Sequence, residues 1–161
     1  MLRQQDYARA LTPLLPQAGR YALSILRNRS DAEDAVQTAA LRGLERLASF
    51  DEARSFNGWW FAVLRNCCID RLRRSRRFPL AAVDIETVAA SPEEPEPDWA
   101  ALDRALQGLP DAQAEVVRLH YFAGLRYADI AASLSIPIGT VMSRLHNARQ
   151  ALAAQLKEEA R

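Results

Sequence analysis

The fold of the first half of the chain is decided by residues 55–77, which read SFNGWWFAVLRNCCIDRLRRSRR. Ser55 is of a residue type that commonly precedes a helix, and neither proline nor glycine occurs in residues 59–77. At about 100° of rotation per residue, the apolar side chains of this stretch occupy one broad arc. They are Trp60, Phe61, Leu64, Cys67, Cys68 and Leu72. The pattern predicts one long helix that is buried along this arc.

The opposite arc of this helix carries Trp59, Asn66, Asp70 and Arg73. Arginines bind phosphates, an aromatic ring stacks on bases and an amide pairs with a base edge, so this face suits nucleic acid. The alternative is a solvated basic helix end whose arginines complement the helix dipole, with Trp59 in the core. We expect Asp70 to be an internal ion-pair partner of an arginine rather than a general base.

The charges of the chain are unevenly distributed, although the net charge is only +1. Residues 1–80 carry 14 arginines against 8 acidic residues, whereas residues 81–110 carry 1 arginine against 7 acidic residues. Residues 111–161 are nearly neutral. This distribution indicates a basic lobe, an acidic segment and a near-neutral lobe.

The periodicity of the remaining chain predicts further helices and no strands. Helices are expected over residues 2–29 (two short ones), 32–48, 98–108, 112–122, 127–134 and 139–157. Asp31 and Asp111 are expected to cap the helices that follow them, and Tyr121 is expected in the core. The predicted fold is all-α, with two small helical domains at residues 1–77 and 98–161. A flexible linker rich in proline and acidic residues, residues 78–97, is expected to join them.

Residues 127–152, YADIAASLSIPIGTVMSRLHNARQAL, have the spacing of a helix-turn-helix. Ala131 is small enough for a close helix crossing, Ser135 opens the turn and Val141 packs back on the first helix. Thr140, Ser143, Asn147 and Gln150 point away from the apolar stripe, and Arg144 and Arg149 flank them. Such a face suits the major groove and its phosphates. The alternative is a helical hairpin that makes no DNA contact.

Several classes of function are disfavoured by what the sequence lacks. It contains no phosphate-binding glycine loop and no His–carboxylate pair, and its two histidines are isolated, so neither an enzyme nor a zinc site is expected. Cys67 and Cys68 are adjacent in a helix and cannot comfortably bridge each other. No apolar run approaches about 18 residues. We expect a reduced, cytoplasmic protein without metal, cofactor or membrane insertion of its own.

The order of these motifs resembles the extracytoplasmic-function (ECF) sigma factors of the sigma-70 family. The resemblance rests on DAEDxVQ at residues 31–37, on W-x(6)-N-x(3)-D-x-L-R-R at residues 59–74, and on Y-x-DIA followed by PxGTVxSRL-x-x-AR at residues 127–149. It covers nearly the whole chain except the linker. It implies that residues 1–77 are region 2, which binds core RNA polymerase and opens the −10 promoter element. Residues 98–161 would be region 4, which reads the −35 element.

The resemblance also assigns roles to individual residues. The polymerase-binding residues would be Asp31, Glu33, Asp34, Gln37 and Leu41. The −10 element would be bound by Phe50, Ser55, Asn57, Trp59, Trp60, Asn66, Arg71, Arg73 and Arg74. The −35 element would be bound by Thr140, Met142, Ser143, Arg144, His146, Asn147 and Arg149. Many family members carry a basic residue in place of Met142 and of Asn147. Ser135 replaces a frequent turn glycine, and a serine is tolerated there if the residue avoids a positive φ.

The resemblance implies core RNA polymerase, promoter DNA and an anti-sigma factor as partners. Two other interpretations are a stand-alone helix-turn-helix regulator and a sigma-like mimic that sequesters an anti-sigma factor. The acidic start of helix 32–48 has an alternative explanation as simple capping and dipole complementation.

Overall fold

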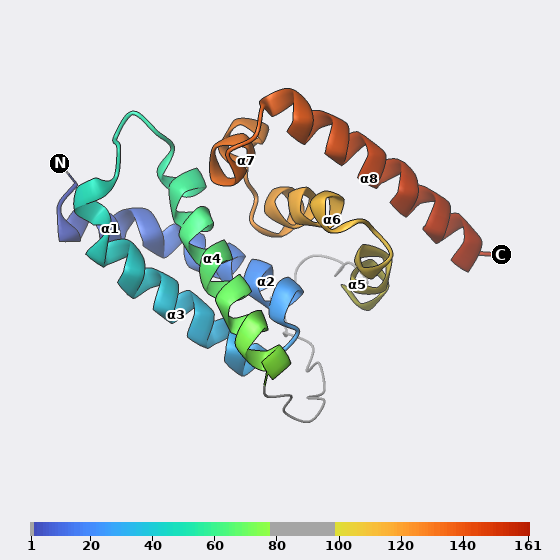
Figure 1. Ribbon diagram of the computed structural model, residues 1–161, viewed down its shortest axis with the longest axis horizontal. Coiled ribbons are helices and arrows are strands. Elements are labelled where there is room, and N and C mark those ends of the chain that lie inside the picture. Colours follow the sequence, from blue (N-terminus) through green and yellow to red (C-terminus); the bar gives the residue numbers. More distant parts are fainter. Residues whose placement is uncertain (1, 78–98) are drawn as a thin grey trace.

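The computed structural model describes residues 2–77 and 99–161, and within these two ranges the chain is helical, with no strand (Figure 1). The predicted all-α class is therefore confirmed. The expected linker, residues 78–97, lies outside the described residues. In the described ranges, no helix combines the length and the apolar character needed to cross a membrane.

The first lobe contains four α-helices and two 3-10 turns. They are α1 (Gln4–Leu11), η1 (Thr12–Leu14), α2 (Leu15–Leu26), α3 (Arg29–Glu45), η2 (Leu47–Ser49) and α4 (Phe56–Arg77). Helix α4 packs against both α2 and α3, and its apolar arc is buried as predicted, with Trp60, Phe61 and Leu64 fully enclosed. The long helix with the Trp-Trp pair is thus the centre of this lobe.

A buried polar contact fixes α1 against α3 and α4. The Tyr7 hydroxyl donates to the carbonyl oxygen of Ala40 at 2.7 Å and accepts from Trp60 Nε1 at 3.0 Å. Gly43 lies under the Tyr7 hydroxyl, and a Cβ atom at this position would collide with it. Both polar groups of the Tyr7–Trp60 pair are therefore satisfied inside the core, as buried polar groups require.

Two predicted helix caps, Asp31 and Asp111, lie inside their helices in the structure. Helix α3 begins at Arg29, and Asn28 caps it by accepting a 2.9 Å hydrogen bond from the backbone N–H of Asp31. Asp31 therefore lies in the first turn, and its predicted role as the cap was wrong. Helix α6 likewise begins at Asp111 with Pro110 before it. In both cases the carboxylate lies in the first turn and faces the positive end of the helix dipole, although neither aspartate is the cap.

The second lobe ends in the helix-turn-helix. Its elements are α5 (Trp99–Gln107), α6 (Asp111–Val117), a π-helical turn η3 (Arg118–Phe122), α7 (Tyr127–Leu134) and α8 (Ile138–Glu159). The turn between α7 and α8 begins with Ser135 at φ 54° and ψ 46°, in the left-handed region. The condition that Ser135 avoids a positive φ is therefore not met, and the serine bears a backbone cost that glycine would avoid.

The π-helical turn changes which side chains are buried. Leu119 and Phe122 face the core, whereas Tyr121 is 51% exposed. Because a π turn inserts one additional residue into the helical repeat, it rotates the following side chains away from the face expected for an α-helix. The prediction that Tyr121 belongs to the core was therefore wrong.

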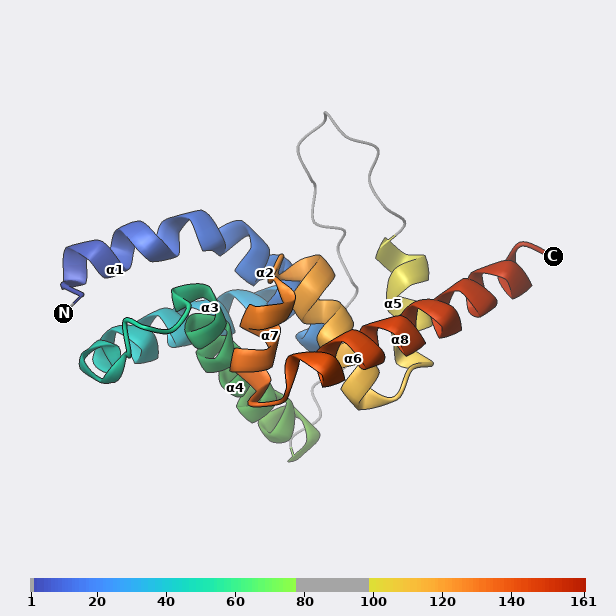
Figure 2. The same cartoon turned by 90° about the horizontal axis from the view of Figure 1, so that it is seen from above.

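The two lobes pack against each other, with α7 lying on the first turns of α4 (Figure 2). The Ser133 hydroxyl donates to the backbone carbonyl of Gly58 at 2.6 Å. A Cβ atom on Gly58 would lie 3.0 Å from the backbone oxygen of Asp129, so glycine permits this close approach. Arg65 on α4 forms an ion pair with Glu115 on α6. The C-terminal end of α8 projects away from the first lobe (Figures 1 and 2).

Candidate nucleic-acid interface

The acidic start of α3 is held by an arginine of α4. Arg71 Nη2 lies 3.0 Å from Asp31 Oδ1 and 2.9 Å from Asp34 Oδ2. Its Nε donates a further bond to Asp31 at 3.1 Å. The sequence interpretation placed Arg71 on DNA and the two carboxylates on polymerase, but the structure brings the three together. One guanidinium thus forms ion pairs with two carboxylates and connects the predicted polymerase-binding and DNA-binding surfaces.

The outer face of α3 remains open beside this cluster. Asp34, Gln37 and Leu41 follow one another at helical spacing and are exposed, with Leu41 at 64%. Glu33 is also exposed and pairs with Arg29 one turn earlier at 3.1 Å. Leu41 gives this face one exposed apolar side chain beside charged and amide groups.

The predicted internal partnership of Asp70 is confirmed. Arg42 Nη1 on α3 donates to Asp70 Oδ2 at 3.2 Å and also approaches the Cys67 sulfur at 3.5 Å. The hydrogen bond with Asp70 is the main reason that the pKa of Arg42 is raised. Farther along α4, Arg73 and Arg74 are exposed at the end of the helix. The basic C-terminal part of α4 therefore combines internal ion pairs with outward-facing guanidinium groups.

Aromatic rings cluster at the beginning of α4. The Trp59 ring lies 4.9 Å from the Phe50 ring and 5.8 Å from the Phe56 ring, measured between centroids. Trp59 is partly buried and keeps some surface, whereas Trp60 has none. Trp60 therefore packs in the core of this structure, as its place on the apolar arc predicts, and its assignment to the DNA surface is corrected.

The remaining −10 candidates lie around this cluster. Asn66 is exposed two helical turns beyond Trp59, about 10 Å along the axis, on the same side of α4. Asn57 is exposed in the first turn. Ser55 has a structural role, because its Oγ accepts from the backbone N–H of Gly58 at 3.3 Å, which confirms the predicted cap. The side of α4 that carries Trp59 and Asn66 thus offers a ring, an amide and then the guanidinium group of Arg73, whereas Asn57 lies on the other side of the helix.

The helix-turn-helix presents the expected buried stripe and outer face. Ile130, Val141, Leu145 and Ala148 are fully buried between α7, α8 and the rest of the lobe. Of the residues predicted for the outer face of α8, Met142, Ser143, His146, Asn147, Arg149 and Gln150 are exposed, while Thr140 and Arg144 are half-buried. The Ser143 hydroxyl turns back to the Thr140 carbonyl at 3.2 Å. The first four turns of α8 are therefore accessible to a groove.

Arg149 is held by two tyrosines, a contact that the sequence analysis missed. Its Nε donates to Tyr121 Oη at 2.8 Å and its Nη2 donates to Tyr127 Oη at 3.1 Å. These two bonds raise the pKa of Arg149. Tyr121 and Arg149 are 28 residues apart in the sequence, and the π-helical turn is what brings Tyr121 to the surface. No local sequence pattern therefore predicts this hydrogen bond. The guanidinium is held in place at the edge of the outer face of α8.

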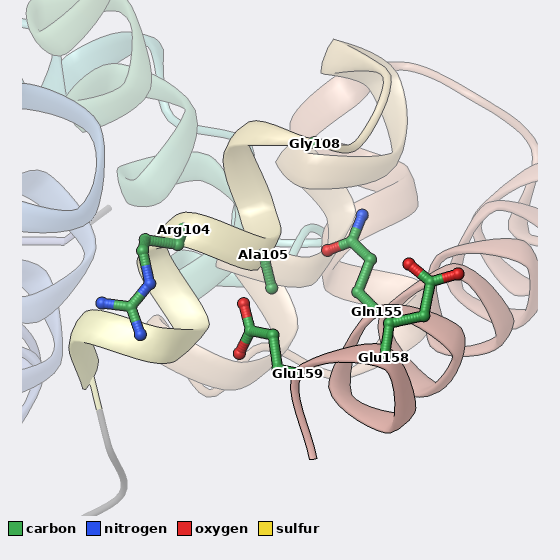
Figure 3. A pocket seen from close by; sticks show the side chains of 6 residues that line it. All are labelled: Arg104, Ala105, Gly108, Gln155, Glu158 and Glu159. Carbon is green, nitrogen blue, oxygen red and sulfur yellow. The ribbon is translucent and has the colours of Figure 1, made fainter. Parts of the chain in front are cut away.

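A small hollow of about 40 Å³ lies between α3 and α4, beside the basic end of α4, and is lined by Ala35, Thr38, Arg42, Cys67, Asp70, Arg71 and Arg74. The larger one, of about 390 Å³, opens between α5 and the end of α8 (Figure 3). It is lined by Arg104, Ala105, Gly108, Gln155, Glu158 and Glu159. Within residues 2–77 and 99–161, no three His, Cys, Asp or Glu side chains group in a way that could hold a metal ion. Burial raises the pKa of Cys68 to about 12, so this thiol stays protonated near neutral pH.

Comparison with known proteins identifies both lobes. The family Sigma-70 region 2 matches residues 11–78, and the family Sigma-70 region 4 matches residues 99–152. The ECF RNA polymerase sigma factor SigL of Mycobacterium tuberculosis is 41% identical over 147 residues, which cover 86% of this chain and 82% of SigL.

Two solved structures resemble the whole chain. The sigma factor RpoE of Bartonella quintana, in complex with the anti-sigma factor NepR, superposes with a TM-score of 0.76 at 31% identity, covering 95% of this chain and 98% of RpoE. CnrH, in complex with the cytosolic domain of CnrY, shares the fold with a TM-score of 0.74 at 23% identity, covering 97% of this chain and 90% of CnrH. The chain belongs to the ECF sigma factors of the sigma-70 family.

Proposed function

We propose that this protein directs promoter-specific transcription initiation as a sigma subunit of bacterial RNA polymerase. The observation that carries the proposal is the occurrence, in one chain, of two different nucleic-acid faces, one on α4 and one on α8. A protein that binds only duplex DNA through a helix-turn-helix has no use for the ring-and-amide face of α4. The protein acts by binding and positioning, in the cytoplasm, and requires no catalytic residues, metal or cofactor of its own.

The first lobe contacts core polymerase through the outer face of α3, with Asp34, Gln37 and Leu41 as its exposed contact residues. The same lobe opens the −10 element. Extruding a base costs a few kcal/mol, which stacking on an aromatic ring and hydrogen bonds to an amide offset. Trp59, with Phe50 behind it, and Asn66 supply these contacts, while Arg73 and Arg74 bind the phosphates.

The second lobe reads the −35 element with α8. Its outer face enters the major groove, and Arg144 and Arg149 contact the phosphates on either side. The two tyrosine hydroxyls hold the Arg149 guanidinium in one orientation, so little side-chain entropy is lost when it meets a phosphate.

The packed arrangement of the lobes corresponds to an inactive form. The −10 and −35 elements are separated by about 25 base pairs, or about 85 Å of B-form DNA. Lobes that touch through Gly58 and Ser133 cannot reach both elements at once, so the lobes separate in the active complex. The likeness to RpoE supports this view, because a single superposition over 95% of the chain includes both lobes, and RpoE in that structure is bound to an anti-sigma factor. An anti-sigma factor that stabilises the packed form is the expected regulator.

Run-off transcription from a library of genomic fragments tests the proposal. Purified protein is assayed with and without core RNA polymerase, and discrete starts are expected only when both are present. Sequence-specific binding without core polymerase would instead indicate a stand-alone regulator. An absence of starts under both conditions, with intact binding to an anti-sigma factor, would indicate a mimic.

A further inference from the structure

The first two turns of α8 expose two large apolar side chains that the core does not use. Ile138 is 49% exposed and Met142, one turn later, is 53% exposed. Their neighbours Val141 and Leu145 are completely buried against α7, so the helix already has its core contacts without them. The pair forms an apolar edge beside the outer face of α8.

The position of this edge indicates its occupant. The N-terminal residues of the second helix of a helix-turn-helix are those that reach base edges in the major groove. No basic residue occurs between Arg126 and Arg144, so this part of the motif offers the hydroxyls of Thr140 and Ser143 but no cation for a phosphate and no guanidinium for the acceptor edge of guanine. Arg144 lies about half a turn after Met142 and is half-buried, and Arg149 lies about two turns after Met142 on nearly the same side of the helix.

The only large apolar group that B-form DNA offers in the major groove is the C5-methyl group of thymine. Methionine is flexible and polarizable and adapts its shape to such a contact. We infer that Ile138 and Met142 read thymine methyl groups in the −35 element, and that promoters of this protein carry thymine beneath these two side chains. The inference rests on the proposed function and adds the base class that α8 prefers.

Replacing thymine by deoxyuridine tests the inference, because it removes only the methyl group. The holoenzyme, assembled from the full chain and core polymerase, first selects promoter DNA from a library randomised at −35. Each −35 thymine of the selected sequence, on either strand, is then replaced by deoxyuridine, and the dissociation constant is measured. A loss of about fourfold for each contacted thymine is expected, the factor that corresponds to burial of one methyl group.

Variants then assign the effect to the residues. In Met142→Ala, replacing one particular thymine by deoxyuridine should no longer weaken promoter binding. In Ile138→Ala, the same should hold for a different thymine. Leu156→Ala is the matched control, since Leu156 is 50% exposed on the same helix but lies near its far end. This control should keep the full fourfold sensitivity.

The outcomes separate the two proposals. A holoenzyme that selects a promoter but has no thymine preference at −35, or is indifferent to deoxyuridine there, overturns the inference and leaves the proposed function standing. A sensitivity that persists unchanged in Met142→Ala and Ile138→Ala also overturns it. A chain that selects no promoter with core polymerase overturns the proposed function and the inference together.

Discussion

The hydroxyl of Ser133 donates a 2.6 Å hydrogen bond to the backbone carbonyl of Gly58, 75 residues earlier in the chain. This bond joins the first helix of the helix-turn-helix to the first turn of the central helix of the other lobe. It is possible because α7 approaches α4 at a residue that has no side chain. The contact therefore depends on the size of one residue.

Replacing Gly58 by alanine is expected to weaken the packing of the lobes. The new Cβ atom would lie 3.0 Å from the backbone oxygen of Asp129, and a backbone atom cannot move aside without moving α7. Small-angle scattering should show a larger radius of gyration for Gly58→Ala than for the natural chain. Gly19→Ala is the control, because it has the same gain in helix propensity but free space around the new atom. Equal radii for the two variants would contradict this account of closure.

The two arginines Arg71 and Arg73 should respond differently to neutralisation. Arg73→Gln removes an exposed cation, so the salt dependence of promoter binding by the holoenzyme should decrease by about one unit in slope. Arg71→Gln should leave this slope unchanged, since its charge is already used by Asp31 and Asp34. It should instead lower stability by about 1 kcal/mol or less, because the ion pairs are partly exposed. A reduced slope in Arg71→Gln would restore Arg71 to the DNA surface.

Substitutions of the two adjacent tryptophans should have different effects, one on promoter opening and the other on stability. Trp59→Ala, and equally Asn66→Ala, is expected to abolish opening of the −10 element, measured by fluorescence of 2-aminopurine placed there, while binding to core polymerase is kept. Trp60→Ala should lower the free energy of unfolding by about 3–5 kcal/mol, because it empties a core site and removes the partner of Tyr7. Loss of polymerase binding in Trp59→Ala would show that the face was misassigned.

The turn of the helix-turn-helix offers a stabilising substitution. Ser135 has φ 54°, which costs a residue with a side chain roughly 1–2 kcal/mol. Ser135→Gly removes this cost but makes the unfolded chain more flexible, so a net gain of about 0.5–1 kcal/mol is expected in chemical denaturation. Ala132→Gly, at an exposed position of α7, should have the opposite sign. A destabilised Ser135→Gly would mean that the left-handed turn is absent in solution.

The features that the sequence predicted are those with local causes. The buried arc of α4, the Ser55 cap and the helix-turn-helix follow from spacing within a few turns, and all three occur as expected. Asn28 and Asp31 are both suitable cap residues and are three positions apart, so the sequence does not decide between them. In the structure the backbone leaves the helix at Asn28, which is therefore the cap. The π-helical turn at Tyr121 leaves no signal in the residue pattern.

The contacts between different helices could not be predicted from the sequence, because they depend on how the helices pack. The double ion pair of Arg71 depends on the register of α4 against α3, and one guanidinium among several arginines cannot be singled out beforehand. The approach of Gly58 to α7 depends on the docking of two lobes that the sequence treats separately. Such contacts between distant segments can be identified only from the three-dimensional structure.

The closed pair of lobes also sets how this protein competes for a limited supply of core polymerase. If only the separated form binds, the apparent dissociation constant equals the intrinsic one divided by the fraction of molecules that are open. Every 1.4 kcal/mol or so of closure free energy therefore weakens apparent binding tenfold. Under this condition the Gly58–Ser133 contact would act as a threshold, and this subunit would displace other sigma factors only when its concentration rises or its packed form is destabilised.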